Sequence, residues 1–261
     1  MRVALHLLHG IALAAYIFPR LAPVQRAARV QRWSACLLHI LAVRLEISGV
    51  PAHGTAPAML VANHVSWLDV YALNAVRPAR FVTKADVLHW PLIGFFAHKA
   101  GSVFIDRSRR RDILRVNALM AALLREGETV AVFPEGTTST GDAVLPFRPP
   151  LLQPAVVCGA HLQAVAIRYA RADGSLCSEA DFTGDKTLFS ALLQVLTQPV
   201  IHARLQFLPP IACRGLHRRD LAREAEQQVA GALDLAAGKV RAVSPACPQR
   251  PHEHALGVSQ L

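Results

Sequence analysis

The sequence predicts an α/β fold, in which helices flank a mixed, largely parallel sheet behind an apolar N-terminal helical segment. Short apolar, strand-like runs alternate with helical stretches along the chain, and this alternation is typical of parallel or mixed sheets. Two of the runs, Ala58–Ala62 and Thr129–Val132, end directly at polar segments, as buried parallel strands do where they deliver side chains to one sheet edge. The 261 residues are enough for one such domain with a sizeable core.

The N-terminus is the first element, and its composition points to a membrane. Val3–Phe18 is apolar apart from two histidines and one glycine, and Pro19 ends it. Residues 1–44 contain six arginines and no acidic residue. A helix over Val3–Phe18 reaches about 24 Å, short of the roughly 30 Å hydrocarbon core. A marginal span, a re-entrant segment and a helix lying in the interface all fit. If it spans, the positive-inside rule places the rest of the chain in the cytoplasm.

Two further interpretations of this region stay open. Ala12-Leu13-Ala14 imitates a signal-peptide cleavage site, but the apolar run continues past it and the arginines beyond oppose export. Trp33–Val43 is a second apolar piece, either packed beside the first or a core helix of the main domain.

The main domain is expected over residues 44–243, between a membrane-associating segment over 1–43 and a disordered tail over 244–261, where proline, histidine and glutamine are frequent. The first strand alternates apolar and polar residues and then meets Gly49 and Pro51, as an edge strand does. Strands are expected at Arg44–Val50, Ala58–Ala62, Arg80–Thr83, Ser102–Ile105, Thr129–Phe133, Val165–Tyr169 and Ile201–Leu208. Helices are expected at Ser66–Val76, Pro91–Ala97, Arg109–Arg125, Leu151–Gly159, Thr187–Leu196 and Arg218–Ala237.

Composition favours a lipid surface over nucleic acid as the anionic partner. The net charge of +10 and the pI near 10.1 suggest an anionic partner, either nucleic acid or a lipid surface. Aromatic residues make up only 6%, and neither zinc-finger spacing nor an RNA-recognition signature appears. A nucleic-acid role would therefore rest on charge alone, whereas the apolar N-terminus independently indicates lipid.

An imidazole lies five residues before a carboxylate at the end of a buried strand. His64 and Asp69 would be about 140° apart on an unbroken helix. They can meet only if His64 lies in the turn after the strand and Asp69 in the first turns of the next helix, for which Asn63 and Ser66 are suitable caps. A histidine oriented by a carboxylate can take a proton from a hydroxyl near neutral pH. The alternative is a capping or partly buried histidine beside a solvated aspartate.

The cysteines and the histidine–aspartate pair do not suggest a metal. Five cysteines are odd in number and form no C-x-x-C pair, which indicates a reducing compartment. A metal at His64 and Asp69 would need two more ligands, and none lies at a recognisable spacing. We therefore expect no cofactor and no metal.

Four segments in order resemble the motifs of one enzyme family. They are Asn63–Asp69, Gly101–Arg107, Phe133–Ser139 and Leu162–Tyr169. The first has the pattern Asn-His-x-Ser-x-x-Asp, the second ends in an arginine, the third begins Phe-Pro-Glu-Gly-Thr and the fourth is hydrophobic. Together they resemble the glycerophospholipid acyltransferases, the family of 1-acyl-glycerol-3-phosphate acyltransferases, over roughly residues 40 to 210. Lys84, Pro91 and Gly94 also fall in family-like places.

The resemblance implies that His64 is the general base that activates an acceptor hydroxyl and that Asp69 orients it. The hydroxyl then attacks an acyl thioester directly, without a covalent acyl-enzyme. The residues agree with this, because no Ser or Cys lies in a Gly-x-Ser-x-Gly pattern. The turn at Gly136 and Thr137 could supply backbone N–H donors to the oxyanion, and a close-approach turn favours glycine there.

The second and third motifs of the family bind the glycerol-phosphate end of the acceptor. This implies substrate-binding roles for Arg107, whose guanidinium suits bidentate phosphate binding, and for Glu135. Lys84 is a weaker candidate for substrate binding. The other arginines of the second segment are expected to face anionic lipid: Arg109, Arg110, Arg111 and Arg115.

Two departures from the family pattern concern the acceptor. Thr138 stands where the third motif commonly continues with arginine, which removes a cation where an anionic headgroup is expected. Ala164 falls where the fourth motif usually holds a proline. With Thr138 in place of the arginine, the third motif resembles that of family members that act on other lysolipids.

The sequence therefore predicts a lysophospholipid O-acyltransferase at the cytoplasmic face of the inner membrane. Its partners would be a lysolipid acceptor, an acyl thioester of coenzyme A or acyl carrier protein, and an anionic membrane surface. The predicted acceptor hydroxyl is the 2-position of 1-acyl-glycerol-3-phosphate, with a lyso-ornithine lipid or a zwitterionic lysophospholipid as alternatives. A thioesterase that activates water is a variant of the same chemistry. A non-catalytic membrane-surface protein is the alternative of another class, and it would leave His64, Asp69, Glu135 and Gly136 unexplained.

Overall fold

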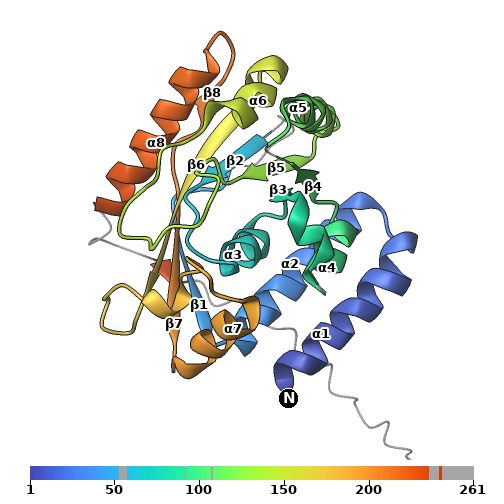
Figure 1. The fold of residues 1–261 in the computed structure, drawn as a ribbon, viewed down its shortest axis with the longest axis vertical. Coiled ribbons are helices and arrows are strands. Elements are labelled where there is room, and N and C mark those ends of the chain that lie inside the picture. Colours follow the sequence, from blue (N-terminus) through green and yellow to red (C-terminus); the bar gives the residue numbers. More distant parts are fainter. Residues whose placement is uncertain (53–57, 91, 107, 235–240, 243–261) are drawn as a thin grey trace, which may run out of the picture.

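The computed structural model describes residues 1–52, 58–90, 92–106, 108–234 and 241–242 (Figure 1). One sheet runs in the order β4-β3-β5-β2-β6-β7-β1-β9, and β8 pairs with β6. Its strands are β1 (Val43–Ser48), β2 (Ala58–Ala62), β3 (Arg80–Lys84), β4 (Val103–Ile105), β5 (Thr129–Val132), β6 (His161–Ala170), β7 (Ile201–Phe207), β8 (Ile211–Ala212) and β9 (Arg241–Ala242). The α-helices are α1 (Arg2–Ala12), α2 (Pro23–Ile40), α3 (Leu68–Val76), α4 (Ile93–Lys99), α5 (Arg110–Arg125), α6 (Gln153–Cys158), α7 (Leu188–Thr197) and α8 (Arg218–Asp234).

The predicted fold class is confirmed. Strands β4, β3, β5, β2 and β6 pair in parallel, as β1 does with β7, whereas β6–β7, β6–β8 and β1–β9 are antiparallel. The expectation that Arg44–Val50 forms an edge strand is wrong. Strand β9 pairs with Glu46 and Ile47, on the side of β1 away from β7. Because β9 comes from the far end of the chain, the alternating residues of β1 give no signal of this pairing.

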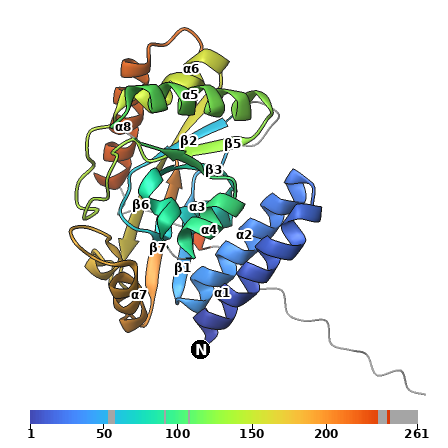
Figure 2. The ribbon, with the colours of Figure 1, turned by 45° about the vertical axis from the view of Figure 1, so that its right-hand side comes forward.

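Both faces of the sheet are covered by helices. On β2, Met59 and Val61 belong to one buried cluster, with side chains from α5, α6 and α8. Leu60 and Ala62 belong to the other, with side chains from α2, α3 and α7. Because successive strand residues point to opposite faces, a strand buried on both sides consists of apolar residues throughout, and all five residues of β2 are buried. Figure 1 and Figure 2 place α5, α6 and the start of α8 at one end of the molecule, and α7 and the start of α1 at the other.

The apolar N-terminus forms one continuous helical stretch over Arg2–Arg20. It begins as α1, continues through a π-helical turn, Leu13–Ile17 (η1), and ends in a 3-10 turn, Phe18–Arg20 (η2), that contains Pro19. Within the described residues it is the one helix long and apolar enough to cross a membrane, by length and composition only. Nineteen residues correspond to about 28 Å of helix. Helix α2 returns beside α1 (Figure 2) and packs against α3.

Most predicted helices are present, with shifted ends. The helix predicted from Ser66 begins at Leu68. The stretch predicted over Leu151–Gly159 divides into a 3-10 turn, Pro149–Leu152, and α6. A further 3-10 turn, Ala85–His89 (η3), follows β3. The last residues of the predicted C-terminal helix and the tail 244–261 lie outside the described residues.

Candidate active site

The two polar motif segments meet at the carboxyl ends of β2 and β5. These strands are parallel neighbours, so the chain emerges from both at the same edge of the sheet. There the Ser139 N–H donates to the His64 carbonyl oxygen at 2.7 Å. The sheet therefore brings together residues that are some seventy positions apart in the sequence.

His64 and Asp69 form a hydrogen-bonded pair across the turn between β2 and α3. Nδ1 of His64 lies 2.8 Å from Oδ2 of Asp69, whose side chain is fully buried. The same oxygen accepts the backbone N–H groups of Val65, at 2.8 Å, and Ser66, at 3.0 Å. The turn thus wraps around the carboxylate. An Nδ1–H donated to Asp69 fixes the tautomer of the ring and leaves Nε2 as the proton acceptor for a substrate.

Tyr169 completes the coordination of this carboxylate. The Tyr169 hydroxyl, at the end of β6, donates to Oδ1 of Asp69 at 2.8 Å. Burial, followed by the charge of Asp69, raises the pKa of Tyr169 well above its usual value, so the hydroxyl remains a donor. Sequence reasoning missed Tyr169. The available signal was its position, since Tyr169 is the one hydroxyl-bearing residue of this strand and it closes the fourth motif segment.

The expected capping residues anchor the turn in a different way. Asn63 bonds β6 with both ends of its amide, donating from Nδ2 to the Ile167 carbonyl and accepting the Ile167 N–H at Oδ1, each at 2.8 Å. The Oγ of Ser66 accepts the Leu68 N–H at 3.2 Å, where α3 begins. The helix starts later than predicted because the residues before it form the loop around Asp69.

Phe133 and Glu135 hold His64 from the side of β5. The Phe133 ring stacks on the imidazole with centroids 4.0 Å apart and planes 9° apart. Oε2 of Glu135 accepts the His64 N–H at 3.2 Å, and Oε1 accepts the Leu145 N–H at 3.1 Å. Burial raises the pKa of Glu135 to about 7, although both hydrogen bonds lower it. Because both carboxyl oxygens accept backbone N–H groups, Glu135 supports the His64 turn. It is not among the described side chains that line the cavity.

The third motif segment contributes a turn to the cavity wall. Gly136 has φ +81°, in the left-handed region that favours glycine, and its N–H donates to the Phe133 carbonyl at 3.2 Å. Gly136 and Thr137 both line the cavity beside His64. The Thr138 hydroxyl donates to the Phe182 carbonyl. The Gly136 N–H is thus used in a hydrogen bond within the turn. The Thr137 N–H is then the donor that this turn could offer to an oxyanion.

The predicted cationic residues are spread over the surface. Lys84 lines the cavity, and its ammonium group pairs with Asp86. Arg107 lies outside the described residues, so its predicted role stays a prediction. Arg109 pairs with Asp106 at 3.0 Å, and Arg115 pairs with Asp112 at 2.6 Å. Arg110 and Arg111 are exposed at the start of α5.

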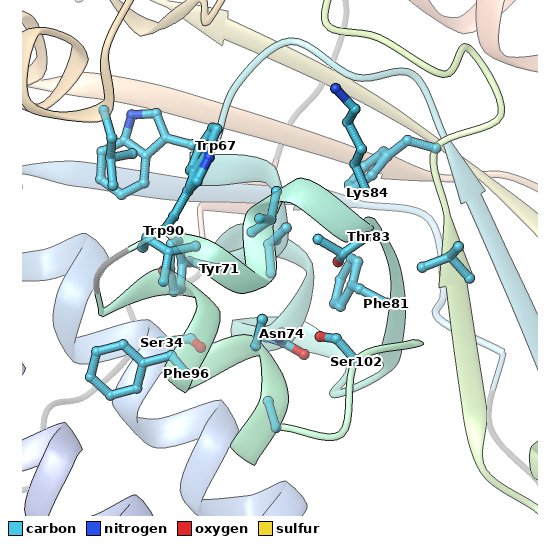
Figure 3. A pocket seen from close by; sticks show the side chains of 18 of the residues that line it. Ser34, Trp67, Tyr71, Asn74, Phe81, Thr83, Lys84, Trp90, Phe96 and Ser102 are labelled. Carbon is cyan, nitrogen blue, oxygen red and sulfur yellow. The ribbon is translucent and has the colours of Figure 1, made fainter. Parts of the chain in front are cut away.

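A cavity of about 430 Å³ extends from His64 into the space between the N-terminal helices and α3 and α4. Trp67 also lines it, and its buried indole N–H has no partner within the described chain. Figure 3 shows further lining side chains, both aromatic and polar: Tyr71, Phe81, Trp90, Phe96, Ser34, Asn74 and Ser102. Its shape and lining suit an acyl chain with a reactive group placed beside the imidazole.

The described residues contain no group of three or more histidine, cysteine, aspartate or glutamate side chains that could hold a metal ion. The arrangement can instead perform general base catalysis. It presents a histidine nitrogen to an apolar cavity, and a buried carboxylate stabilises the imidazolium that forms on proton transfer.

Proteins with similar sequences include lipid acyltransferases. The sequence profile of the Acyltransferase family matches residues 44–168. A lyso-ornithine lipid O-acyltransferase of Pseudomonas aeruginosa is 38% identical over 232 residues, which cover 86% of this chain and 88% of the relative. A 1-acyl-sn-glycerol-3-phosphate acyltransferase of Neisseria meningitidis serogroup B is 36% identical over 187 residues, 71% of this chain and 72% of the relative.

A solved structure shares the fold. The crystal structure of the 1-acyl-sn-glycerophosphate acyltransferase PlsC from Thermotoga maritima superposes with a TM-score of 0.63 over 92% of this chain and 98% of its own, at 18% sequence identity. The likeness extends over nearly the whole chain, including the sheet and the helices around it.

Proposed function

The chain belongs to the acyltransferase family, and we propose that it transfers a fatty acyl group from a thioester to the free hydroxyl of a lysolipid, with His64 as general base. The observation that carries the proposal is the pairing of His64 Nδ1 with the buried carboxylate of Asp69, 2.8 Å away, at one end of an apolar cavity. The reaction needs no cofactor, because the thioester supplies the activated acyl group.

The proposed reaction is a single acyl transfer in which one proton moves out and back. Nε2 of His64 takes the proton of the acceptor hydroxyl as its oxygen attacks the thioester carbonyl carbon. The tetrahedral intermediate collapses, the carbon–sulfur bond breaks, and the imidazolium returns the proton to the leaving thiolate. Asp69 stabilises the imidazolium between these steps.

The oxyanion of the intermediate requires donors at the same end of the cavity. Two candidates border it, the Thr137 N–H beside the Gly136 turn and the indole N–H of Trp67. An unpaired buried donor costs about 1–3 kcal/mol, which a bound substrate oxygen would relieve. Donors of this kind are most effective when they meet the charge only as it develops.

The acceptor headgroup is the finer part of the proposal. An acceptor of the 1-acyl-glycerol-3-phosphate type needs a cation for its phosphate. Lys84 and Lys99 line the cavity, and Arg107 would be a further candidate. Thr138 stands where the family commonly has arginine, and its hydroxyl is bonded to Phe182. The missing cation favours a lyso-ornithine lipid, and this is also the substrate named for the Pseudomonas aeruginosa relative.

We place the enzyme at the membrane, where both its acceptor and its product reside. The apolar helical stretch Arg2–Arg20 and the net charge of +10 support association with an anionic bilayer. Its location at the cytoplasmic face of the inner membrane follows from the donors, since acyl carrier protein and coenzyme A thioesters are cytoplasmic.

The test is thiol release from an oleoyl thioester by detergent-purified protein, against lyso-ornithine lipid, 1-acyl-glycerol-3-phosphate and a zwitterionic lysolipid. We expect acceptor-dependent release that is lost in His64→Ala and retained in His161→Ala, a matched exposed histidine. Release without acceptor would indicate a thioesterase. No release with folded protein and intact donor would overturn the proposed activity.

A further inference from the structure

Three segments that are far apart in the sequence border the cavity and also expose large apolar side chains. The end of the N-terminal helical stretch lines it through Leu13 and Phe18, the residues around η3 line it through Val87 and Trp90, and the start of α7 lines it through Leu188. On their outer sides these segments expose Tyr16, Ile17, Leu88, Leu92 and Phe189. Apolar side chains are therefore exposed on all three segments of the cavity rim, and the cavity lining is itself mostly apolar.

The residues after η3 and those before α7 touch each other beside the cavity. The rings of Trp90 and Phe182 are in edge contact, with centroids 6.4 Å apart, and both residues line the cavity. Phe182 precedes α7 by a short loop whose Gly184 also lines it. The turn after β3 and the approach to α7 thus form one continuous part of the rim.

Helix α7 has an exposed face that nothing in the described chain covers. Phe189 is 70% exposed, and Leu193 and Leu196 are each 48% exposed. Their spacing of four and three residues places them on one stripe of the helix, opposite the buried Ala191 and Val195. The helix contains no charged residue, although its outer face meets solvent. An apolar stripe of this kind indicates a partner.

We propose that the apolar stripe of α7, Phe189, Leu193 and Leu196, docks on the lipid bilayer as a second membrane contact beside the N-terminal helix and seats the cavity mouth on the membrane. This inference rests on the proposed function only in that a lysolipid must reach the cavity from a bilayer. The partner is a lipid surface because Leu188, the residue before Phe189, lines the same cavity as Leu13 and Phe18 of the N-terminal helix, which is itself suited to membranes by length and composition. A second protein copy on this face would cover the route by which lipid enters.

The experiment measures binding to lipid without requiring catalysis. Full-length wild type and the double variant Phe189→Glu/Leu193→Glu are mixed with vesicles of phosphatidylethanolamine and phosphatidylglycerol at a 3:1 ratio, and the bound fraction is measured by sedimentation. Because two large apolar side chains leave the interface, we expect the apparent partition coefficient to fall at least about tenfold. Val157→Glu, on an exposed residue of α6 at the end of the molecule opposite α7 (Figure 1), is the matched control and should bind as wild type does.

Activity then separates docking from chemistry. The double variant should show a raised KM for lysolipid presented in vesicles and wild-type turnover of a short-chain, monomeric lysolipid. The milder pair Phe189→Ser/Leu196→Ser should change lipid binding and KM in the same direction. Its unchanged melting temperature would show that these effects do not come from misfolding.

Unchanged partition in both pairs would overturn the proposal. So would a wild-type dimer that the variants convert to a monomer without loss of lipid binding, since a second copy would then cover this face. Wild-type protein that binds vesicles but transfers no acyl group would contradict the proposed function and leave the docking surface standing.

Discussion

The turn that carries His64 and the helix α7 border the same cavity, and they are stabilised in opposite ways. Both oxygens of the Asp69 carboxylate that the turn surrounds have partners: His64 Nδ1 and the Val65 and Ser66 N–H groups on Oδ2, and the Tyr169 hydroxyl on Oδ1. Helix α7 instead leaves its largest side chain, Phe189, in solvent. The difference shows which of the two tasks, proton transfer or lipid docking, requires a rigid structure. Proton transfer needs a geometry fixed within the fold, whereas lipid docking needs a surface that the fold leaves unpaired.

The largest effect should come from the buried carboxylate. Asp69→Asn removes the charge that stabilises the imidazolium and offers an amide to a ring nitrogen and two backbone donors, so the wrong tautomer is favoured. We expect turnover to fall by about 10³–10⁴-fold, measured as acceptor-dependent thiol release with the protein still folded by circular dichroism. Asp220→Asn, an exposed aspartate of α8 paired with Arg223, should retain wild-type rates. A loss of less than tenfold in Asp69→Asn would show that the turn does not act through this carboxylate.

Tyr169→Phe tests the same network from the side of β6. It leaves Oδ1 of Asp69 without its hydroxyl donor, which should lower the free energy of unfolding by about 1–3 kcal/mol. Turnover should fall more than KM changes, because Tyr169 meets Asp69 and is not among the described residues that line the cavity. Denaturant unfolding and steady-state kinetics provide the two readouts. Equal activity of Tyr169→Phe and of Tyr16→Phe, an exposed tyrosine, would remove Tyr169 from the positioning network.

Glu135→Gln tests how burial tunes the support behind His64. The pKa of Glu135 is raised from 4.5 to about 7 in the folded protein, so the folded state holds a proton that the unfolded chain releases. The wild type is therefore most stable, in this respect, below pH 4.5, and it loses that contribution as the pH rises to about 7. Melting temperatures from pH 4 to pH 8 should show a decline in wild type that is smaller in Glu135→Gln. Parallel profiles would show that this carboxyl does not titrate in the window.

The smallest effect is expected at the turn beside the histidine. Gly136→Ala places a Cβ on a residue with φ +81°, which costs about 1–2 kcal/mol. Gly231→Ala, inside α8 with open space around the glycine, should be neutral or stabilising by up to about 1 kcal/mol. Thermal unfolding of the two variants gives the comparison. A Gly136→Ala protein as stable as wild type would mean that the turn adopts another conformation.

The sequence predicted the parts of this molecule that local pattern determines. The buried strand before His64 and the helix after it required the turn in which the imidazole meets Asp69. Partners supplied by distant strands left no local signal. Tyr169 reaches Asp69 only because β6 lies beside β2, and β9 covers β1 from the far end of the chain. Glu135 differs from both. Its place in the third motif suggests that it binds substrate, whereas its carboxyl oxygens meet two backbone N–H groups.

Phe182 joins the two regions compared above. Its N–H donates to the Val65 carbonyl at 2.9 Å, its own carbonyl accepts the Thr138 hydroxyl, and its ring meets Trp90 at the rim. One residue therefore ties both motif turns to the approach to α7. With the protein seated on a bilayer through that helix, the acceptor is sampled in two dimensions. The velocity should then follow the mole fraction of lysolipid in the membrane, and dilution with inert lipid should slow the enzyme even when the total amount of substrate is constant.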